Sequence, residues 1–440
     1  MPQPIDTLVV PRWLIPVEPA GVLTEHAVAI HQSAILDVLP AVEARTRYAA
    51  DRTLNLPQHA LIPGLINLHT HAAMTLLRGF ADDLPLMDWL ERHIWPAEQT
   101  HVSSRFVKDG TLLACAEMLR GGVTCFNDMY FFPDAAAEAV LECGMRAAIG
   151  MIVMDLATPY ASDGPDYLAK GLTCRDKYKG EAALSFCFAP HAPYTVNDES
   201  FRQIATLVGQ IGAPIHCHLH ETLEEIAHSE SRYGVRPLER LARLGLLGPG
   251  FIGVHAIHLS EPEIDTLARH GCHVAHCPAS NLKLASGLPD VARLLRAGIN
   301  LGIGTDGAAS NNRLNMFGEM RLAALLAKGV ASDAAALPAH AALKAATLGG
   351  AKALGLEDHV GSLAPGKRAD LVAVNLSGLD LLPVFDPLSH LVYVAGREQV
   401  SHVWVDGRLK VDNGRLTDVD VMDLRARAGY WSNKLSTVDP

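Results

Sequence analysis

The middle of the chain repeats one pattern eight times. Each unit is a short apolar, β-branched run that ends in polar or histidine-rich residues. A longer stretch with apolar residues three and four apart follows each run, as is typical of an amphipathic helix. Eight alternating units over about 250 residues predict an α/β fold of the (β/α)8, TIM-like type. The expected strands are Leu61–His69, Val123–Asp128, Arg146–Met154, Leu184–Pro190, Pro214–His220, Phe251–His258, His273–Pro278 and Asn300–Asp306.

A doubly wound open sheet is the rival architecture. It usually needs fewer strands and a glycine-rich phosphate loop after its first strand. The residues that follow Leu68 are not glycine-rich, so the pattern favours the barrel.

The two ends of the chain have a different character, with short alternating strands and the hairpin signals VDG and DNG near the C-terminus. Neither end has enough strands for a stable sheet by itself. We therefore expect both ends to form one small β-sandwich domain beside the barrel. The expected division is 1–60 and 361–440 for the β-sandwich and 61–360 for the barrel.

Composition excludes several classes of protein. The 440 residues carry a net charge of −11, whereas a nucleic-acid groove needs clustered lysine and arginine. The first residues lack the pattern of a signal peptide, and no run of about 18 apolar residues suggests a membrane span. The eight cysteines form no Cys-x-x-Cys pair. We expect a cytoplasmic protein that binds neither nucleic acid nor a membrane, and we allow for a homo-oligomer.

Ionisable residues close five of the expected strands, at the rim where barrels carry out chemistry. His69 and His71 lie on one face of the first strand, because side chains alternate along a strand. The other strand ends contribute His191, then His216, His218 and His220 followed by Glu221, then His255 and His258, and Asp306.

These residue types suit one divalent metal ion, which we expect to be Zn2+. Three imidazoles and one carboxylate would hold it, from His69, His71, Asp306 and one strand-five histidine, and spacing alone leaves the choice among His216, His218 and His220 open. Glu221 could act as the general acid and base, and His255 could hold the activated water. A second metal would need a bridging group such as a modified lysine, and the fourth strand, EAALSFCFAPHAP, has no lysine.

Four segments carry a resemblance to a known superfamily: PGLINLHTHAAMTLLRG, HCHLHET, HCPASNLKLASG and GIGTDGAASNNRLNMFGEMRLA. Together with the C-terminal GSLAPGKRADLVAV, they resemble the amidohydrolase superfamily over nearly the whole chain. Within it the chain is similar to 5'-methylthioadenosine/S-adenosylhomocysteine deaminases. The resemblance implies hydrolytic deamination of an adenine nucleoside, with 5'-methylthioadenosine as the expected substrate and S-adenosylhomocysteine and adenosine as alternatives.

The resemblance also implies roles for individual residues. The metal ligands would be His69, His71, His218 and Asp306. Glu221 would move a proton from the activated water to ring N1, His255 would orient that water, and Asp306 would accept a proton from it. Glu98 would bind the ribose hydroxyls, although without the resemblance it reads as a solvated glutamate at a helix end. His191 would contact the purine, Trp89 would line the pocket or fill the core, and Asn281 and Lys283 would be loop scaffolding.

One departure from the family pattern bears on the substrate. Members that take S-adenosylhomocysteine well hold its carboxylate with arginines, and the segment after the third strand, DLATPYASDGPDYLAKGLTC, has none. Arg146 and Arg175 are the nearest candidates in sequence. The uncharged methylthio compound is therefore favoured.

Two alternatives remain. The same metal site would serve a guanine or cytosine deaminase or a triazine hydrolase, and Glu98 is the discriminating residue because a free base has no ribose diol. An inactive scaffold is a remote alternative, since such proteins usually lose metal ligands.

Overall fold

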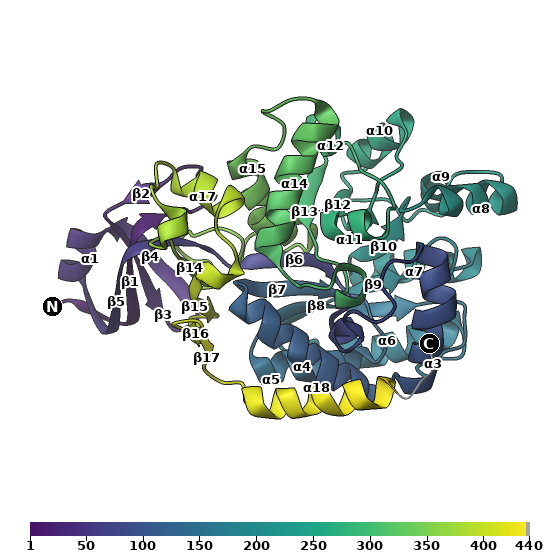
Figure 1. The fold of residues 1–440 in the computed structure, drawn as a ribbon, viewed down its shortest axis with the longest axis horizontal. Coiled ribbons are helices and arrows are strands. Elements are labelled where there is room, and N and C mark those ends of the chain that lie inside the picture. Colours follow the sequence, from purple (N-terminus) through teal and green to yellow (C-terminus); the bar gives the residue numbers. More distant parts are fainter. Residues whose placement is uncertain (437–440) are drawn as a thin grey trace.

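The structure is a computed structural model that describes residues 1–436. It consists of a barrel and a separate mixed sheet (Figure 1). Eight parallel strands pair in chain order around the barrel. Their residues are almost all buried, because one face lines the barrel interior and helices cover the other. The strands are β6 (Leu65–Thr70), β7 (Val123–Asp128), β8 (Arg146–Val153), β9 (Leu184–Pro190), β10 (Ile215–Leu219), β11 (Phe251–His255), β12 (His273–His276) and β13 (Asn300–Ile303).

All eight predicted barrel strands are present, but the first begins later than predicted. Leu61–Pro63 are the end of β5 (Tyr48–Pro63) in the other sheet, and β6 begins at Leu65. Gly64 separates the two strands. A Cβ at Gly64 would lie 2.0 Å from Oγ1 of Thr124 on β7, so only glycine fits where the chain passes from one sheet to the other.

Helices surround the barrel and cover its rim. Side-chain caps start several of them, such as Ser103 and Asn315, which accept hydrogen bonds from backbone N–H groups of the first turn. Within residues 1–436, no helix is both long and apolar enough to cross a membrane. The helices are α1 (Ala41–Arg47), η1 (Ala72–Leu77), α2 (Leu86–Trp89), η2 (Leu90–Ile94), α3 (Trp95–His101), α4 (Ser104–Arg120), α5 (Pro133–Cys143), α6 (Gly164–Tyr178), α7 (Asp198–Ile211), α8 (Leu223–Tyr233), α9 (Pro237–Arg243), α10 (Glu261–Arg269), α11 (Pro278–Lys283), α12 (Val291–Arg296), α13 (Ala308–Asn311), α14 (Met316–Ala331), α15 (Ala339–Lys344), η3 (Ala345–Gly349), α16 (Gly350–Ala353), η4 (Leu379–Leu381), α17 (Pro387–Tyr393), η5 (Arg397–Gln399) and α18 (Val421–Leu435).

Hydrogen bonds join the last barrel strand to the first beyond the end of β13. The backbone N–H of Asp306 donates to the carbonyl of His69 at 2.9 Å. The buried amide of Asn67 accepts from the N–H of Thr305 at 2.9 Å and donates to its Oγ1 at 2.8 Å. These bonds fix the position of Asp306 relative to His69.

The second sheet confirms that the two ends of the chain build one β-domain. N-terminal and C-terminal strands meet where β5 pairs antiparallel with β14, for example Pro63 with Leu371. We keep the domain limits near residues 60 and 360 as a proposal, and residues 437–440 of the predicted C-terminal segment lie outside the described residues. The remaining strands are β1 (Gln3–Leu14), β2 (Leu23–Thr24), β3 (His26–His31), β4 (Ala34–Pro40), β14 (Leu371–Asn375), β15 (Val400–Val405), β16 (Arg408–Asp412) and β17 (Arg415–Leu416).

After the β-domain, the C-terminal segment returns to the barrel. Helix α18, the yellow helix in Figure 1, packs against α4. Buried Asp109 of α4 accepts hydrogen bonds from Nε1 of Trp431 at 2.9 Å and from Nη1 of Arg427 at 2.7 Å. This helix was not predicted from the sequence.

Candidate active site

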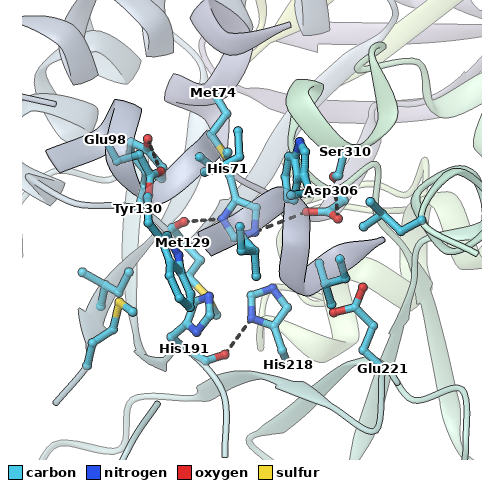
Figure 2. Close-up of a pocket in the computed structure, with 18 of the residues that line it drawn as sticks. His71, Met74, Glu98, Met129, Tyr130, His191, His218, Glu221, Asp306 and Ser310 are labelled. Atoms are coloured by element: carbon cyan, nitrogen blue, oxygen red, sulfur yellow. Dashed lines mark hydrogen bonds and ion pairs between the residues drawn. The ribbon is translucent and has the colours of Figure 1, made fainter. Parts of the chain in front are cut away.

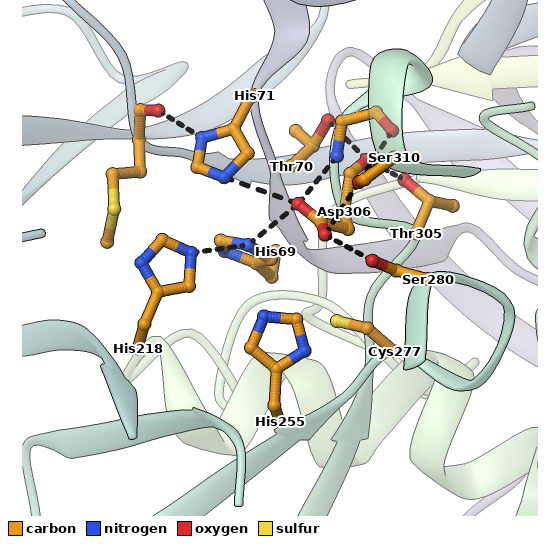
Figure 3. A network of polar contacts seen from close by, with 12 residues as sticks. His69, Thr70, His71, His218, His255, Cys277, Ser280, Thr305, Asp306 and Ser310 are labelled. Carbon is orange, nitrogen blue, oxygen red and sulfur yellow. Dashed lines mark hydrogen bonds and ion pairs between the residues drawn. The ribbon is translucent and has the colours of Figure 1, made fainter. Parts of the chain in front are cut away.

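Four of the predicted site residues converge at the carboxyl ends of the barrel strands (Figure 3). Nε2 of His69 and Nε2 of His71 each lie 3.2 Å from Oδ1 of Asp306. Nε2 of His218 lies 3.3 Å from Nε2 of His69. Asp306 and His255 adopt left-handed backbone conformations, with φ of 62° and 66°. Non-glycine residues adopt this region at a cost of about 1–3 kcal/mol, and such residues gather at functional sites.

The other ring nitrogen of each histidine is held by a hydrogen bond. Nδ1–H of His71 donates to the carbonyl of Met129 at 2.6 Å, and Nδ1–H of His218 donates to the carbonyl of His191 at 2.6 Å. Nδ1 of His69 lies 2.9 Å from Nε2 of His216. In neutral His71 and His218 the Nε2 lone pairs therefore face the centre of the cluster, which is the arrangement that metal-binding histidines adopt.

Asp306 supplies the negative charge of the cluster. Its Oδ2 accepts from Oγ of Ser280 at 2.6 Å and Oγ of Ser310 at 2.7 Å. Burial alone would raise the pKa of Asp306, but the imidazoles of His69 and His71 outweigh this effect and hold the pKa well below its usual range. Asp306 is therefore an anion in the protein interior.

The cluster fits a divalent metal ion. Burial lowers the pKa of His69 to about 4, whereas hydrogen bonding to Asp306 overcomes burial at His71 and raises its pKa to about 9. Without a cation, a proton on His71 balances the charge of Asp306, and a metal ion would replace that proton. The potential ligand atoms of His69, His71 and Asp306 all lie within 4.8 Å of one another, as do those of His69, His218 and His255. Imidazole and carboxylate are ligands that divalent transition metals accept.

A second buried carboxylate, that of Glu319, supports the helices whose serines bind Asp306. Glu319 of α14 accepts from the backbone N–H of Ala279 at 3.0 Å and from Nδ2 of Asn311 at 2.8 Å. Ala279 belongs to α11, which carries Ser280, and Asn311 belongs to α13, which carries Ser310. Glu319 therefore joins the two short helices whose serines bind the same oxygen of Asp306.

Glu221 and His255 lie beside the cluster. Nε2 of His255 is 3.7 Å from Oε2 of Glu221, and Oγ of Ser286 donates to Oε1 of Glu221 at 3.3 Å. Burial raises the pKa of Glu221, as a group that both accepts and donates a proton requires. Nδ1 of His255 donates to Oδ1 of Asn281 at 2.8 Å, so Asn281, which we expected to be scaffolding, also orients a site residue.

Glu225 fixes the backbone that carries Glu221. Its carboxylate accepts from the N–H of His220 at 3.0 Å and from the N–H of Glu221 at 2.8 Å. Thr222 caps α8 at the same turn by accepting from the N–H of Glu225. The start of α8 thus holds Glu221 at the end of β10.

A pocket with an empty volume of about 650 Å³ lies over the cluster (Figure 2). Glu98 lies across the pocket from Glu221 and accepts from the hydroxyl of Tyr130 at 2.6 Å. Burial raises the pKa of Glu98 to about 7, against a smaller lowering by Tyr130. Glu98 is only 8% exposed, so it is a buried carboxylate and not a solvated helix-end residue.

The pocket gathers every predicted site residue except His69, which is fully buried. Nδ1 of His191 lies 3.0 Å from Oγ1 of Thr195, and burial lowers the pKa of His191 to about 3. The pocket is lined by His71, Met74, Leu86, Trp89, Leu90, Ile94, Trp95, Glu98, Met129, Tyr130, Phe131, Ile152, Met154, His191, Tyr194, His218, Glu221, His255, Leu284, Asp306 and Ser310.

The three strand-five histidines have different surroundings. His218 faces the cluster, whereas His216 lies behind His69, and Nε2 of His220 accepts from the N–H of Leu238 at 3.1 Å. Tyr130, Ser280, Ser310 and Glu319 were missed in the sequence. Only Ser310 had a local signal, because it lies four residues beyond Asp306.

Comparison with known proteins matches the chain to one family over most of its length. The sequence profile of the amidohydrolase family matches residues 60–410. A protein named 5-methylthioadenosine/S-adenosylhomocysteine deaminase from Saccharophagus degradans is 48% identical over 433 residues, which is 98% of this chain and 97% of that protein. The crystal structure of an adenosine deaminase from Xanthomonas campestris with bound zinc has a TM-score of 0.98 at 50% identity and full coverage of both chains. An atrazine chlorohydrolase from Arthrobacter aurescens complexed with zinc has a TM-score of 0.89 at 25% identity, with 97% and 100% coverage.

Proposed function

Because this chain belongs to the amidohydrolase family, we propose that it is a metal-dependent aminohydrolase that converts an adenine nucleoside to its 6-oxo analogue and ammonia. The substrate class is that of 5'-methylthioadenosine, S-adenosylhomocysteine and adenosine. The observation that carries the proposal is the convergence of His69, His71, His218 and Asp306 on one side of a pocket that also contains Glu221 and Glu98. The names of the similar deaminases support the same reaction.

In this proposal His69, His71, His218 and Asp306 hold one zinc ion. Two features support these ligands. The Nδ1 atom of each histidine makes a hydrogen bond, and the Nε2 atoms face the centre of the cluster. When bound, the ion would lower the pKa of a water ligand toward neutrality and so supply a nucleophile. A single ion is expected because β9 has no lysine that could bridge two.

The protein's own groups move the protons. A water molecule adds to C6 of the adenine ring while Glu221 takes one of its protons and delivers it to ring N1. Asp306 takes the second proton and passes it to the amino group at C6. The bond between C6 and the amino nitrogen then breaks, ammonia leaves, and a carbonyl remains at C6. His255 orients the water through a hydrogen bond, and Asn281 fixes the ring of His255.

Glu98 and His191 place the nucleoside. A buried carboxylate can accept hydrogen bonds from both hydroxyls of a ribose, and Glu98 lies at the far side of the pocket from Glu221. His191 is on the pocket wall beside His218, from which it can contact the purine. Trp89 lines the same pocket and restricts the space for the ring.

A substrate screen tests the proposal. We expect loss of adenine absorbance with adenosine, 5'-methylthioadenosine or S-adenosylhomocysteine, and release of one ammonia per nucleoside. Adenine, guanine, cytosine and a chlorinated triazine should react far more slowly, because none of them has a diol for Glu98. Activity on a free base or a triazine, together with none on any nucleoside, would favour the alternative hydrolases and contradict this proposal.

A further inference from the structure

A second cavity adjoins the pocket on the side of Glu98. It has an empty volume of about 710 Å³ and shares Trp95, Glu98, Phe131 and Met154 with the pocket. We call this cavity the Glu98 annex. It is lined by Trp95, Glu98, Gln99, Phe131, Met154, Leu156, Ala157, Thr158 and Pro159.

The walls of the Glu98 annex are mostly apolar, and none of its lining residues is cationic. The hydroxyl of Thr158 is bound to that of Tyr167 at 2.6 Å, which holds the loop that forms one wall. Glu98 is the one carboxylate among the lining residues. An anion in the annex would find no counter-charge and would lie near a carboxylate.

The nearby charged groups are bound elsewhere. Nζ of Lys170 donates to the carbonyl of Tyr160 at 2.6 Å and to Asp166 at 2.9 Å. Oδ2 of Asp155 accepts from the N–H of Asn197 at 2.7 Å, at the start of α7. Neither Lys170 nor Asp155 lines the annex.

The two arginines considered as candidates in the sequence, Arg146 and Arg175, also form ion pairs outside the annex. Arg146 lies at the start of β8, at the opposite end of the strand from the site, and bridges to Asp370 at 3.4 Å and Asp406 at 3.1 Å. Arg175 of α6 bridges to Asp176 at 3.3 Å. Neither guanidinium lines the annex.

A different cavity, with an empty volume of about 950 Å³, opens on the side of Glu221. Its walls include Glu91, Glu224 and Glu225 in addition to Glu221, so it is acidic. The two cavities therefore differ in charge, because four glutamates line the acidic cavity and one lines the annex. The annex is at the ribose end of a nucleoside whose diol meets Glu98, and the acidic cavity is at the base end.

Resting on the proposed function, we propose that the Glu98 annex is the subsite for the 5' substituent and that it selects uncharged, apolar groups, including thioethers larger than methylthio. Burial of extra apolar surface in the annex strengthens binding of such groups. A carboxylate there gains no cationic partner and lies near Glu98, so anionic substituents are disfavoured.

A matched series of 5'-thioadenosines tests the subsite. Propylthio and benzylthio adenosine should have kcat/KM within about tenfold of the methylthio compound, whereas the carboxymethylthio compound should fall by more than tenfold. Equal values for carboxymethylthio and propylthio adenosine would overturn the proposal, as would a loss of more than a hundredfold with benzylthio adenosine. A preference for the aminoethylthio compound over all others would show that the subsite selects cations and not apolar groups, and would also overturn the proposal.

Binding to the Glu221→Gln variant separates this proposal from the proposed function. Calorimetric dissociation constants for the same series should follow the same order, whether or not the wild-type protein turns the compounds over. Failure of the wild-type protein to deaminate any of these nucleosides would contradict the reaction alone, and a binding order that favours the carboxylate would contradict the subsite alone.

A gain-of-function variant provides an independent test. Ala157 is exposed and lines the annex but not the pocket or the acidic cavity. Ala157→Arg should raise the kcat/KM for the carboxymethylthio compound relative to the propylthio compound by about tenfold or more. Ala334→Arg, at an exposed position in the loop after α14, is the matched control and should leave the ratio unchanged. An unchanged ratio in Ala157→Arg would contradict the assignment.

Discussion

Nε2 of His218 lies 3.3 Å from Nε2 of His69, while Nδ1–H of His218 is held by the carbonyl of His191 at 2.6 Å. In neutral His218 the Nε2 therefore carries a lone pair that points at a second imidazole. Oδ1 of Asp306 lies 3.2 Å from the same Nε2 of His69. Close donor atoms around one point are stable when they share a cation, which makes metal content the first property to test.

The first prediction concerns metal removal. Chelation should abolish deamination, and added Zn2+ should restore it. Because the ion binds only the folded protein, Tm should rise with free Zn2+ concentration. His218→Ala should lower bound zinc, measured by atomic emission, to well below one ion per chain. His220→Ala is the matched control, since His220 is a buried histidine of the same segment whose Nε2 accepts from the N–H of Leu238. Equal zinc content in both variants would contradict the ligand assignment.

The second prediction concerns Glu221. Glu221→Gln should keep the zinc content and the fold but lower kcat by about 10²–10⁴-fold, because an amide cannot carry a proton from water to the ring. Steady-state kinetics and metal analysis on the same preparation provide the check. Glu224→Gln, at an exposed neighbouring position, should keep wild-type kcat. A Glu221→Gln variant with wild-type turnover would show that another group moves the proton.

Much of this site could be predicted from the sequence because its ionisable residues lie at the ends of strands. His69, His71, His218 and Asp306 each lie at or next to the carboxyl end of a strand, and the (β/α)8 pattern brings those ends together. The position of a residue on a strand was therefore enough to bring residues far apart in sequence into one cluster.

The supporting residues could not be predicted in the same way. Ser280 and Glu319 are polar residues on helices, and their contacts with Asp306 and with α11 depend on how the helices pack. Helix α18 was missed because its contact with α4 rests on Trp431 and Asp109, which are 322 residues apart. The spacing of His216, His218 and His220 predicts that all three lie on one face of the strand. In the structure the backbone turns after Leu219, and His220 accepts a hydrogen bond from Leu238 instead of joining the cluster.

The third prediction concerns Glu319 as a positioning residue. Glu319→Ala should weaken zinc binding by about 10–100-fold, because α11 and α13 lose the carboxylate that joins them. The zinc affinity of Glu319→Gln should lie between that of Glu319→Ala and that of the wild-type protein. The single amide oxygen of the glutamine can accept from either Ala279 or Asn311 but not from both. Competition with a chromogenic chelator measures the affinity.

The control for Glu319 is Glu263→Ala. Glu263 is also a buried carboxylate, but it binds Arg236 and caps α10. Its loss should lower Tm without changing zinc affinity. If the two alanine variants weaken zinc binding equally, Glu319 contributes only to general stability.

The fourth prediction concerns the pH dependence of ribose recognition. Burial raises the pKa of Glu98 to about 7 from an ordinary value near 4.5. Above pH 7 the ionised carboxylate can accept both ribose hydroxyls, and below pH 7 the protonated form loses charged hydrogen bonds worth about 1.5–3 kcal/mol each. The kcat/KM for adenosine should therefore rise with pH through about 7, by about tenfold or more.

A substrate without the diol isolates this effect from the titration of other groups. The ratio of kcat/KM for adenosine to that for 2',3'-dideoxyadenosine should rise with pH in the wild-type protein, because effects on the metal cluster and on Glu221 cancel in the ratio. In Glu98→Gln the ratio should be low at every pH and independent of pH. Tyr130→Phe removes the hydrogen bond that favours the ionised form of Glu98, so it should move the midpoint of the ratio to higher pH. A wild-type ratio that does not change with pH would show that Glu98 is not the residue that binds the ribose.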